Sequence, residues 1–252
     1  MTNWHDCASL SLIIFIVEVL KLTKRNFKQV IEKSVEAIKE GKVIICPTDT
    51  VYGLLANAKN KKAVNNIFKI KKRPKNKYFP IFVKNLKTAI KFTKINKYQE
   101  KILKKVWPGK ITAVLERKRT KIYPVRGQRV WARTQRKQTP LEISKSLTGQ
   151  TSNGVYGVSR KSIALRIPKY KLINGILAKT DLPLIGTSAN TSGEKPSTKI
   201  RKVLNQFKKR EGLPDLVLDA GNLENSKPST VIDLRQKKIK IIRQGEIKFD
   251  AI

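Results

Sequence analysis

The sequence predicts an α/β protein built on one β-sheet, of mixed strand direction, with flanking helices. Helical and strand patterns alternate along most of the 252 residues, and the C-terminal part is rich in strands. Such alternation is typical of helices packed on a sheet. Hydrophobic residues make up 40% of the chain, which is enough for a substantial core in one large domain or two small ones.

The N-terminal elements are predicted as a strand, a helix and a second strand. Residues Val17–Leu22 form the first strand. The helix has Asn26 as its N-cap and Gly41 as its stop. Its apolar face comprises Phe27, Val30, Ile31, Val35 and Ile38. The short apolar run KVIIC, Lys42–Cys46, predicts a buried strand.

Two further pairs of helix and strand follow. The apolar face of the first helix comprises Ala63, Val64, Ile67 and Phe68. This helix must end by Pro74, because proline cannot continue a helix, and strand Ile81–Val83 follows. The apolar face of the second helix comprises Ile102, Leu103, Val106 and Trp107. Pro108 and Gly109 break it before strand Ile111–Leu115.

The C-terminal half adds two helices and several strands. The helices are marked by the apolar sets Leu172, Ile173, Ile176, Leu177 and Ile200, Val203, Leu204, Phe207. The predicted strands are Ser162–Ile167, Leu184–Thr187, Leu216–Asp219, Thr230–Leu234 and Ile239–Arg243.

Two segments depart from this pattern. Residues 1–17 form a nonstandard apolar extension, too short and too acidic at its flanks for a signal peptide or a membrane anchor, although an interfacial tail stays an alternative. A basic insert at about 117–161 is rich in Arg, Gln, Thr, Ser and Gly and shows no periodicity. We expect it to be disordered, with an inserted lid as the alternative. The main domain is then 18–250.

Charge and residue usage limit the function. Fifty-five Lys and Arg residues against 18 acidic ones give a net charge of +37, which favours a phosphate-bearing partner such as a nucleotide, RNA or an anionic membrane surface. A compositional excess of solvated lysines is the plain alternative. The two cysteines, Cys7 and Cys46, allow neither a disulfide framework nor a zinc cluster, and they indicate the cytoplasm.

Familiar catalytic and nucleotide-binding motifs are missing from the sequence. The one histidine, His5, lies in the extension, which argues against Ser-His or Cys-His catalysis and excludes a His-ligated metal. Neither GxxxxGK[ST] nor GxGxxG after a strand occurs. Phosphate chemistry would therefore rest on cationic side chains, backbone amides and hydroxyl groups.

Candidate groups of this kind lie at the ends of predicted elements. PTDTVYGL, Pro47–Leu54, follows a buried strand, where α/β sheets bind ligands, or is an ordinary turn. KIKKRP, Lys69–Pro74, gathers cations that could equally complement a helix dipole. GTSANTSG, Gly186–Gly193, is dense in small polar groups suited to wrapping a polar ligand. Ser197 and Thr198 are N-caps or part of an anion site.

In this order, PTDTVYGL, KKRP, WPGKIT, SIALRIP, GTSANTSGEKPS and IIRQG resemble the YrdC family of threonylcarbamoyl-AMP synthases, in its short single-domain form. The resemblance runs from about Leu20 to Phe249, outside the extension and the insert. It implies a single twisted YrdC-like domain, of the type with a cavity for double-stranded RNA, and a deep basic cavity. It also implies synthesis of threonylcarbamoyl-AMP and pyrophosphate from ATP, L-threonine and bicarbonate or CO2, the first step toward threonylcarbamoyladenosine next to the tRNA anticodon.

The resemblance also implies roles for single residues. Thr50 and Arg166 would contact threonine, and Lys71 and Arg73 would face the ATP phosphates as the catalytic pair. The implied ATP contacts are Arg73, Lys77, Ser162, Ser188, Asn190, Ser197 and Arg243. Mg²⁺ is expected on the triphosphate, held mainly by substrate oxygens, with no metal site formed by protein residues alone.

The sequence departs from the family pattern in two places. Lys77–Pro80 stands where the family has a small polar residue followed by Pro-Leu, and Phe82 stands where some members have a histidine on the threonine side. Both departures lie near the implied pocket.

Other functions stay open at this point. A non-catalytic RNA-binding or tRNA-binding protein of the same fold is the main alternative, and salt-sensitive tRNA binding without ATP consumption would indicate it. A carbamoyl-transfer module is disfavoured, because accessory zinc and acylphosphatase-like segments are missing. Expected partners are the three substrates, tRNA and a threonylcarbamoyl-transferase complex, with no membrane.

Overall fold

A computed structural model describes residues 17–118, 154–207 and 212–248. The apolar extension up to residue 16 and positions 119–153 of the insert lie outside the described residues. The strands are β1 (Glu18–Lys21), β2 (Ile44–Cys46), β3 (Gly53–Asn57), β4 (Ile81–Phe82), β5 (Ile111–Glu116), β6 (Ser162–Arg166), β7 (Leu184–Ser188), β8 (Leu216–Asp219), β9 (Thr230–Asp233) and β10 (Lys240–Arg243). The helices are α2 (Phe27–Lys39), α3 (Lys61–Ile70), α4 (Leu86–Phe92), α5 (Lys97–Val106), α7 (Lys171–Thr180) and α8 (Ile200–Asn205).

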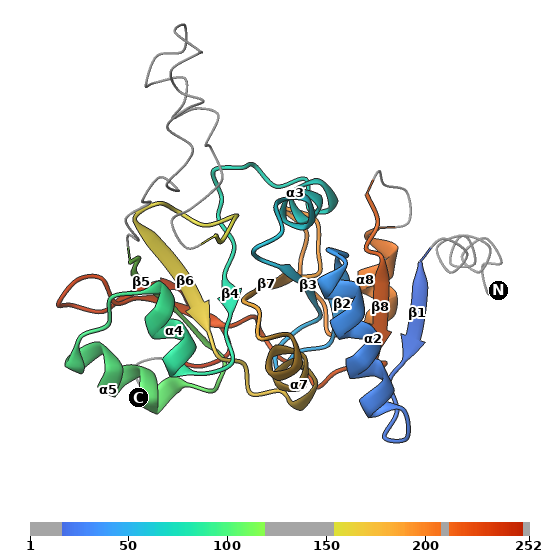
Figure 1. Ribbon diagram of the computed structural model, residues 1–252, viewed down its shortest axis with the longest axis horizontal. Helices are drawn as coiled ribbons and strands as arrows, with labels where there is room; N and C mark the ends of the chain where they lie inside the picture. The colour runs from blue at the N-terminus through green and yellow to red at the C-terminus, as the bar shows by residue number, and fades with distance from the viewer. Residues whose placement is uncertain (1–16, 119–153, 208–211, 249–252) are drawn as a thin grey trace, which may run out of the picture.

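All ten of these strands join one sheet, in the order β1-β8-β2-β3-β7-β4-β6-β5-β9-β10 (Figure 1). The pairs β1–β8, β8–β2, β4–β6 and β5–β9 are parallel, and the remaining pairs are antiparallel. The predicted single mixed sheet with flanking helices is thus confirmed.

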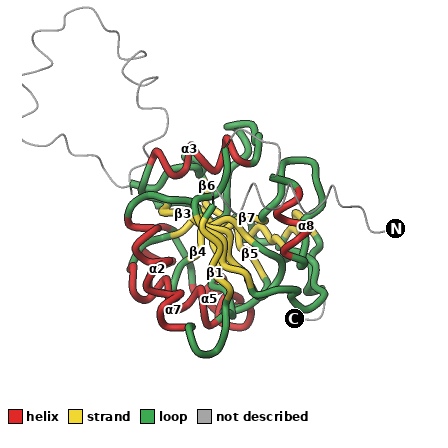
Figure 2. Tube along the Cα trace, turned by 90° about the vertical axis from the view of Figure 1, so that its right-hand side faces the viewer, coloured by secondary structure: helices red, strands yellow, loops and turns green. Residues whose placement is uncertain are grey.

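Helices cover both faces of the sheet. Figure 2 shows α2 and α7 on one side of the strands and α8 on the other. The predicted apolar face of α2 is buried at Val30, Ile31, Val35 and Ile38, and it packs with the buried face of α7. Gly175 of α7 permits this close approach, since a Cβ atom there would come within 2.7 Å of Ile31.

Two elements were not predicted. Strand β3 directly follows PTDTVY, whose turn-forming residues predict a loop that continues through Leu54. Helix α4 is only seven residues long and buries only Ala89 and Phe92, so its periodicity is weak. Asn85 begins α4 by accepting a hydrogen bond from the Thr88 amide at 2.9 Å.

Two helices begin or end near the predicted residues but through other interactions than the sequence predicts. Asn26 precedes α2, but its side chain turns back to the Thr23 amide and to the Lys21 carbonyl and does not cap the helix. Helix α3 ends at Ile70, well before Pro74, because Lys72 adopts the left-handed backbone conformation with φ of 46°.

The C-terminal end of the predicted insert is packed. Val155 and Val158 are buried in the core. Tyr156 donates its amide hydrogen to the Ala58 carbonyl, and Gly157 accepts a hydrogen bond from the Phe79 amide. The expected disorder is therefore wrong for residues 154–161. No helix among the residues that the structure describes is long and apolar enough to cross a membrane.

Candidate functional site

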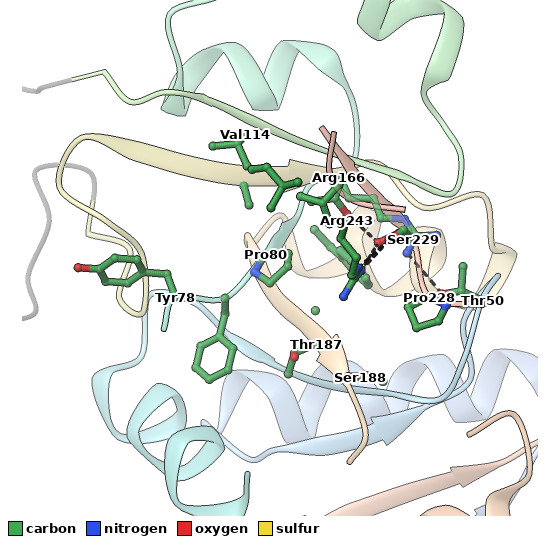
Figure 3. Close-up of a pocket in the computed structure, with 18 of the residues that line it drawn as sticks. Thr50, Tyr78, Pro80, Val114, Arg166, Thr187, Ser188, Pro228, Ser229 and Arg243 are labelled. Atoms are coloured by element: carbon green, nitrogen blue, oxygen red, sulfur yellow. Dashed lines mark hydrogen bonds between the residues drawn. The ribbon is translucent and has the colours of Figure 1, made fainter. Parts of the chain in front are cut away.

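A cavity of about 500 Å³ opens among the loop before β3, the segment before β4, and strands β5, β6, β7, β9 and β10 (Figure 3). This volume is typical of a site for a small molecule. Six of the ten predicted site residues line it: Thr50, Arg73, Ser162, Arg166, Ser188 and Arg243. The other four do not: Lys71, Lys77, Asn190 and Ser197. The fold thus brings together residues from both halves of the chain.

Arg166 is held in the cavity wall by a buried ion pair. Its Nη2 lies 2.6 Å from Asp49 Oδ1, and both side chains are less than 10% exposed. Its Nε donates to the Gly109 carbonyl oxygen at 2.9 Å. The second Asp49 oxygen accepts from the Lys169 amide. Burial lowers the pKa of Arg166 while Asp49 raises it, so the carboxylate keeps this buried guanidinium charged.

One nitrogen of Arg166 is only weakly engaged. Nη1 makes a long contact of 3.5 Å with the Thr50 hydroxyl oxygen. Thr48 donates its hydroxyl hydrogen to the Val51 carbonyl, and its oxygen lies 3.0 Å from the Thr50 hydroxyl. Because the Thr48 hydrogen goes to Val51, the Thr50 hydroxyl donates to Thr48, and Arg166 Nη1 is the donor that remains able to bind a carboxylate from the cavity.

The aromatic ring of Phe82 packs against the same guanidinium group. The Arg166 guanidinium carbon lies 5.6 Å from the centre of the Phe82 ring. The ring also covers Gly186, where an added Cβ atom would come within 2.4 Å of it. Gly186, Phe82 and Arg166 therefore form a stack in which the glycine leaves room for the ring.

Arg243 and Arg73 provide two more cations in the cavity. Arg243 donates Nη2 to the Ser229 carbonyl oxygen at 2.6 Å, as Figure 3 shows. Arg73 donates Nε and Nη2 to the carbonyls of Lys77 and Tyr78. Burial lowers the pKa of both arginines, and Arg73 lowers that of Arg243 further by repulsion. Neither has an acidic partner among the described residues, so the two attract an anion.

Lys71 lies behind the cavity wall. It is only 2% exposed, and its Nζ donates to the carbonyl oxygens of Ser188 and Asn190, each at 2.6 Å. A third bond goes to the Asn190 side-chain oxygen at 2.9 Å. Burial and then repulsion from Arg73 lower the pKa of Lys71 to about 7, whereas three oxygen acceptors favour the ammonium form. In this structure Lys71 fixes the Ser188–Asn190 turn, and its contact with ATP stays a prediction.

The other predicted residues outside the lining differ in their surroundings. The Asn190 amide is engaged by Lys71, Ser188 and two backbone carbonyls. Lys77 is exposed, and only its backbone carbonyl holds Arg73. The Ser197 hydroxyl accepts from the Lys199 amide, and α8 has no side-chain cap. Their contacts with ATP stay predictions.

Polar groups at the site that were not predicted include Asp49, which pairs with Arg166 outside the lining, and Thr112 and Ser229, which line the cavity. Asp49 was noted only as part of PTDT, and the signal for its role was its place next to Thr50 at the end of a buried strand. Thr112 of β5 and Ser229, which directly precedes β9, line the cavity, and their hydroxyl oxygens lie 2.9 Å apart. They lie in strand-like sequence, where polar residues give no clear functional signal.

The lining suits a phosphate ligand better than a metal held by protein groups. Among the residues that the structure describes, no three His, Cys, Asp or Glu side chains are grouped to hold a metal ion. The described lining offers guanidinium and hydroxyl groups but no carboxylate. A Mg²⁺ ion would find neutral oxygen ligands here, as it does when phosphate oxygens supply its charge.

Comparisons with known proteins find one family model and relatives that share one name. A family model named for Sua5, YciO and YrdC, and described as "Telomere recombination", matches residues 36–245. A Methanocaldococcus jannaschii protein named "Putative threonylcarbamoyl-AMP synthase" is 31% identical over 237 residues, 94% of this chain and 96% of that protein. The Pyrococcus abyssi protein named "Threonylcarbamoyl-AMP synthase" is 27% identical over 216 residues, 85% of this chain. This chain spans 54% of the Pyrococcus protein's length.

Solved structures give a similar picture. The crystal structure of Pyrococcus abyssi Sua5 complexed with L-threonine matches with a TM-score of 0.70 and 26% identity, over 94% of this chain and 59% of that one. Escherichia coli YciO matches with a TM-score of 0.67 and 22% identity, over 91% of this chain and 95% of that one. The YciO match shows likeness of fold alone.

Proposed function

The chain belongs to the Sua5, YciO and YrdC family, and from this membership and the cavity we propose that it is a threonylcarbamoyl-AMP synthase. The expected YrdC-like fold is thereby confirmed. The proposed enzyme is a nucleotidyltransferase that makes threonylcarbamoyl-AMP and pyrophosphate from L-threonine, ATP and bicarbonate or CO2. One observation carries the proposal: a single cavity joins Arg166, suited to a carboxylate, with Arg243 and Arg73, suited to phosphates.

The threonine carboxylate would bind at the Arg166 end of the cavity. Asp49 and the Gly109 carbonyl engage Nη2 and Nε, so Nη1 is the nitrogen that can take a ligand oxygen. The Thr50 hydroxyl lies beside it. The similar structure of Pyrococcus abyssi Sua5, which was solved in complex with L-threonine, supports this assignment.

The reaction itself requires positioning and charge stabilisation. The threonine amine combines with bicarbonate, water leaves, and a carbamate forms. A carbamate oxygen then attacks the α-phosphorus of ATP, and the bond to the β-phosphate breaks to release pyrophosphate. Because the attacking oxygen is already anionic, the protein needs mainly to hold the two anions together and to neutralise their charge.

Arg243 would act on both the threonine end and the phosphate end of the cavity. Its charge repels Arg166 and Arg73 alike, so it lies within electrostatic reach of both. A ligand that carries a carboxylate at one end and phosphates at the other would relieve both repulsions. Mg²⁺ would enter with ATP as part of the substrate, and it would supply charge neutralisation on the phosphates.

The product implies further partners. A mixed anhydride of a carbamic acid and a phosphate is a reactive group donor, so a transferase must consume it. We propose that this transferase complex passes the group to tRNA, to form threonylcarbamoyladenosine next to the anticodon. We also propose a cytoplasmic setting, which the scarcity of cysteine supports. The alternative of a non-catalytic RNA-binding protein is not favoured by the names of the relatives.

Pyrophosphate release tests the proposal. The purified protein should release pyrophosphate from ATP only when L-threonine and bicarbonate are both present. Arg73→Ala and Ser188→Ala should lower this rate about 100-fold each, the usual effect of removing a group that stabilises a transition state. Arg201→Ala, which removes an exposed arginine outside the cavity lining, is the matched control and should keep the rate. Folded protein without threonine-dependent release would exclude the synthase.

A further inference from the structure

A second concave surface lies outside the cavity, along α3 and the segment that follows it. It encloses about 540 Å³, and we call it the basic groove. Five cations line it: Lys62, Lys69, Lys72, Arg73 and Lys75. None of the described residues that line it is acidic.

The four lysines of the basic groove have no counter-charge in the part of the chain that the structure describes. The ion pairs recorded there involve other lysines and arginines. Like charges gathered on one surface repel each other, and the repulsion opposes folding. A negatively charged ligand would remove this cost.

Complementing the helix dipole does not explain the cluster. Cations stabilise a helix at its C-terminus, which accounts for Lys69 in the last turn of α3. Lys62, however, lies in the first turn, which has no acidic residue and where a positive charge is unfavourable. The groove therefore carries charge at both ends of the helix.

The spacing of the charges fits an extended anion. Lys62 and Lys69 lie seven residues apart on α3, which is about 10 Å along the axis. Lys72 and Lys75 continue the row beyond the helix end. A single phosphate cannot reach all of these ammonium groups, whereas a chain of phosphates can.

Lys72 occupies a backbone position that normally belongs to glycine. Its φ is 46°. Its amide donates to the Lys69 carbonyl, and the Arg73 amide donates to the Phe68 carbonyl, which is the Schellman arrangement at a helix end. A side chain at this left-handed position costs conformational energy that glycine avoids. Lys72 thus places a cationic side chain at the groove although its backbone conformation is strained for any residue other than glycine.

Tyr78, an exposed aromatic residue that lines the cavity, is joined to the basic groove through Arg73. Tyr78 is 49% exposed, and Figure 3 shows its side chain extending away from the other labelled residues. Its carbonyl oxygen accepts a hydrogen bond from Arg73, which lines both the groove and the cavity. A basic track beside an aromatic platform is the combination that binds single-stranded nucleic acids.

We propose that the basic groove and Tyr78 bind a single-stranded nucleic acid, with successive phosphates on the lysines of α3 and a base stacked on the tyrosine ring. An acidic peptide would use the lysines but gain nothing from stacking. A duplex would keep its bases away from Tyr78. The proposal does not rest on the synthase activity, because it requires neither ATP nor threonine.

Fluorescence anisotropy with a labelled 12-nucleotide RNA, across a range of salt concentrations and without substrates, tests the phosphate contacts. Lys62→Ala combined with Lys69→Ala should weaken binding and reduce the slope of log K against log salt by about 1.4, since each contact on a single strand contributes about 0.7. The matched control is Lys97→Ala with Lys101→Ala, which removes two exposed lysines from α5. An equal loss of RNA affinity in this control would overturn the proposal, because it would show that binding depends on the overall positive charge and not on the groove.

Three single variants test the remaining features. Tyr78→Ala should lower affinity about fivefold or more, and Tyr78→Phe should retain it, since stacking needs the ring and not the hydroxyl. Lys72→Gly should raise the melting temperature and lower the salt slope by about 0.7. Single-stranded DNA in a parallel titration shows whether the sugar is read, and binding of either strand supports the proposal. Binding of a duplex or of polyglutamate as tight as that of RNA, with no effect of Tyr78→Ala, would overturn it.

Discussion

The ammonium nitrogen of Lys71 lies 2.6 Å from the backbone carbonyl oxygen of Ser188, at the end of β7. Its two other hydrogen bonds go to Asn190, so this one buried cation determines how the turn after β7 presents the Ser188 hydroxyl to the cavity. The arrangement separates two tasks that the Lys-x-Arg pattern suggested would be shared. Arg73 lines the cavity, and Lys71 supports its wall.

Lys71→Met should weaken ATP binding about tenfold or more, because hydrogen bonds from a charged group contribute roughly 1.5–3 kcal/mol each and the turn loses three. Ser188→Ala should also weaken it. Because both changes act on the same turn, the double variant should lose less than the sum of the two losses. Calorimetric titration of ATP measures each affinity, and strictly additive losses would instead indicate that Lys71 contacts ATP independently.

The pH dependence of stability should reveal the buried Lys71. Its pKa is about 7 in the folded protein and 10.5 ordinarily, so between these values the unfolded chain binds a proton that the folded chain has released. The free energy of unfolding should therefore rise with pH across this window, by up to about 1.4 kcal/mol per pH unit. Urea unfolding at pH 7, 8 and 9 should show this rise in the parent protein and not in Lys71→Met. A parallel course for the two proteins would mean that the carbonyl oxygens keep the ammonium charged.

Sequence patterns predicted the sheet and most elements because strong apolar periodicity marks them. They failed at β3, where turn-forming residues directly precede the strand, and at α4, which buries too few residues to show a period. The motifs identified Arg166, but its partners Asp49 and Gly109 are 117 and 57 residues away in the chain. Such long-range pairing depends on how strands are ordered, which no local pattern records.

The same limit applies to the direction of side chains. Lys71 and Arg73 are two residues apart and both cationic, yet the left-handed backbone at Lys72 sends one into the protein and the other into the cavity. A helix end with a left-handed residue is expected at glycine, so the lysine at this position did not predict it.

Asp49→Asn should destabilise the protein by about 3 kcal/mol, because it leaves the buried Arg166 without a counter-charge. It should also lower threonine affinity, since the guanidinium loses the group that orients it. Arg166→Lys should raise the KM for threonine about 100-fold with little change for ATP, because an ammonium cannot keep the bonds to Gly109 and Asp49 while binding a carboxylate. Chemical denaturation and steady-state kinetics measure these effects. Unchanged threonine affinity in both variants would show that the carboxylate binds elsewhere.

Gly186→Ala should disturb the threonine end of the cavity more than the ATP end. A Cβ atom at this position would come within 2.4 Å of the Phe82 ring, and the ring lies under the Arg166 guanidinium. Displacing the ring should cost about 1–3 kcal/mol of stability, as overpacking in a core does, and should move Arg166 away from its carboxylate-binding position. Phe82→Leu in the same chain gives the new methyl group room, so the double variant should recover part of both the stability and the threonine affinity. Thermal unfolding and threonine titration of the two single variants and the double variant give the coupling directly. Independent effects of Gly186→Ala and Phe82→Leu would contradict the stack, because two residues that share one volume cannot change without affecting each other.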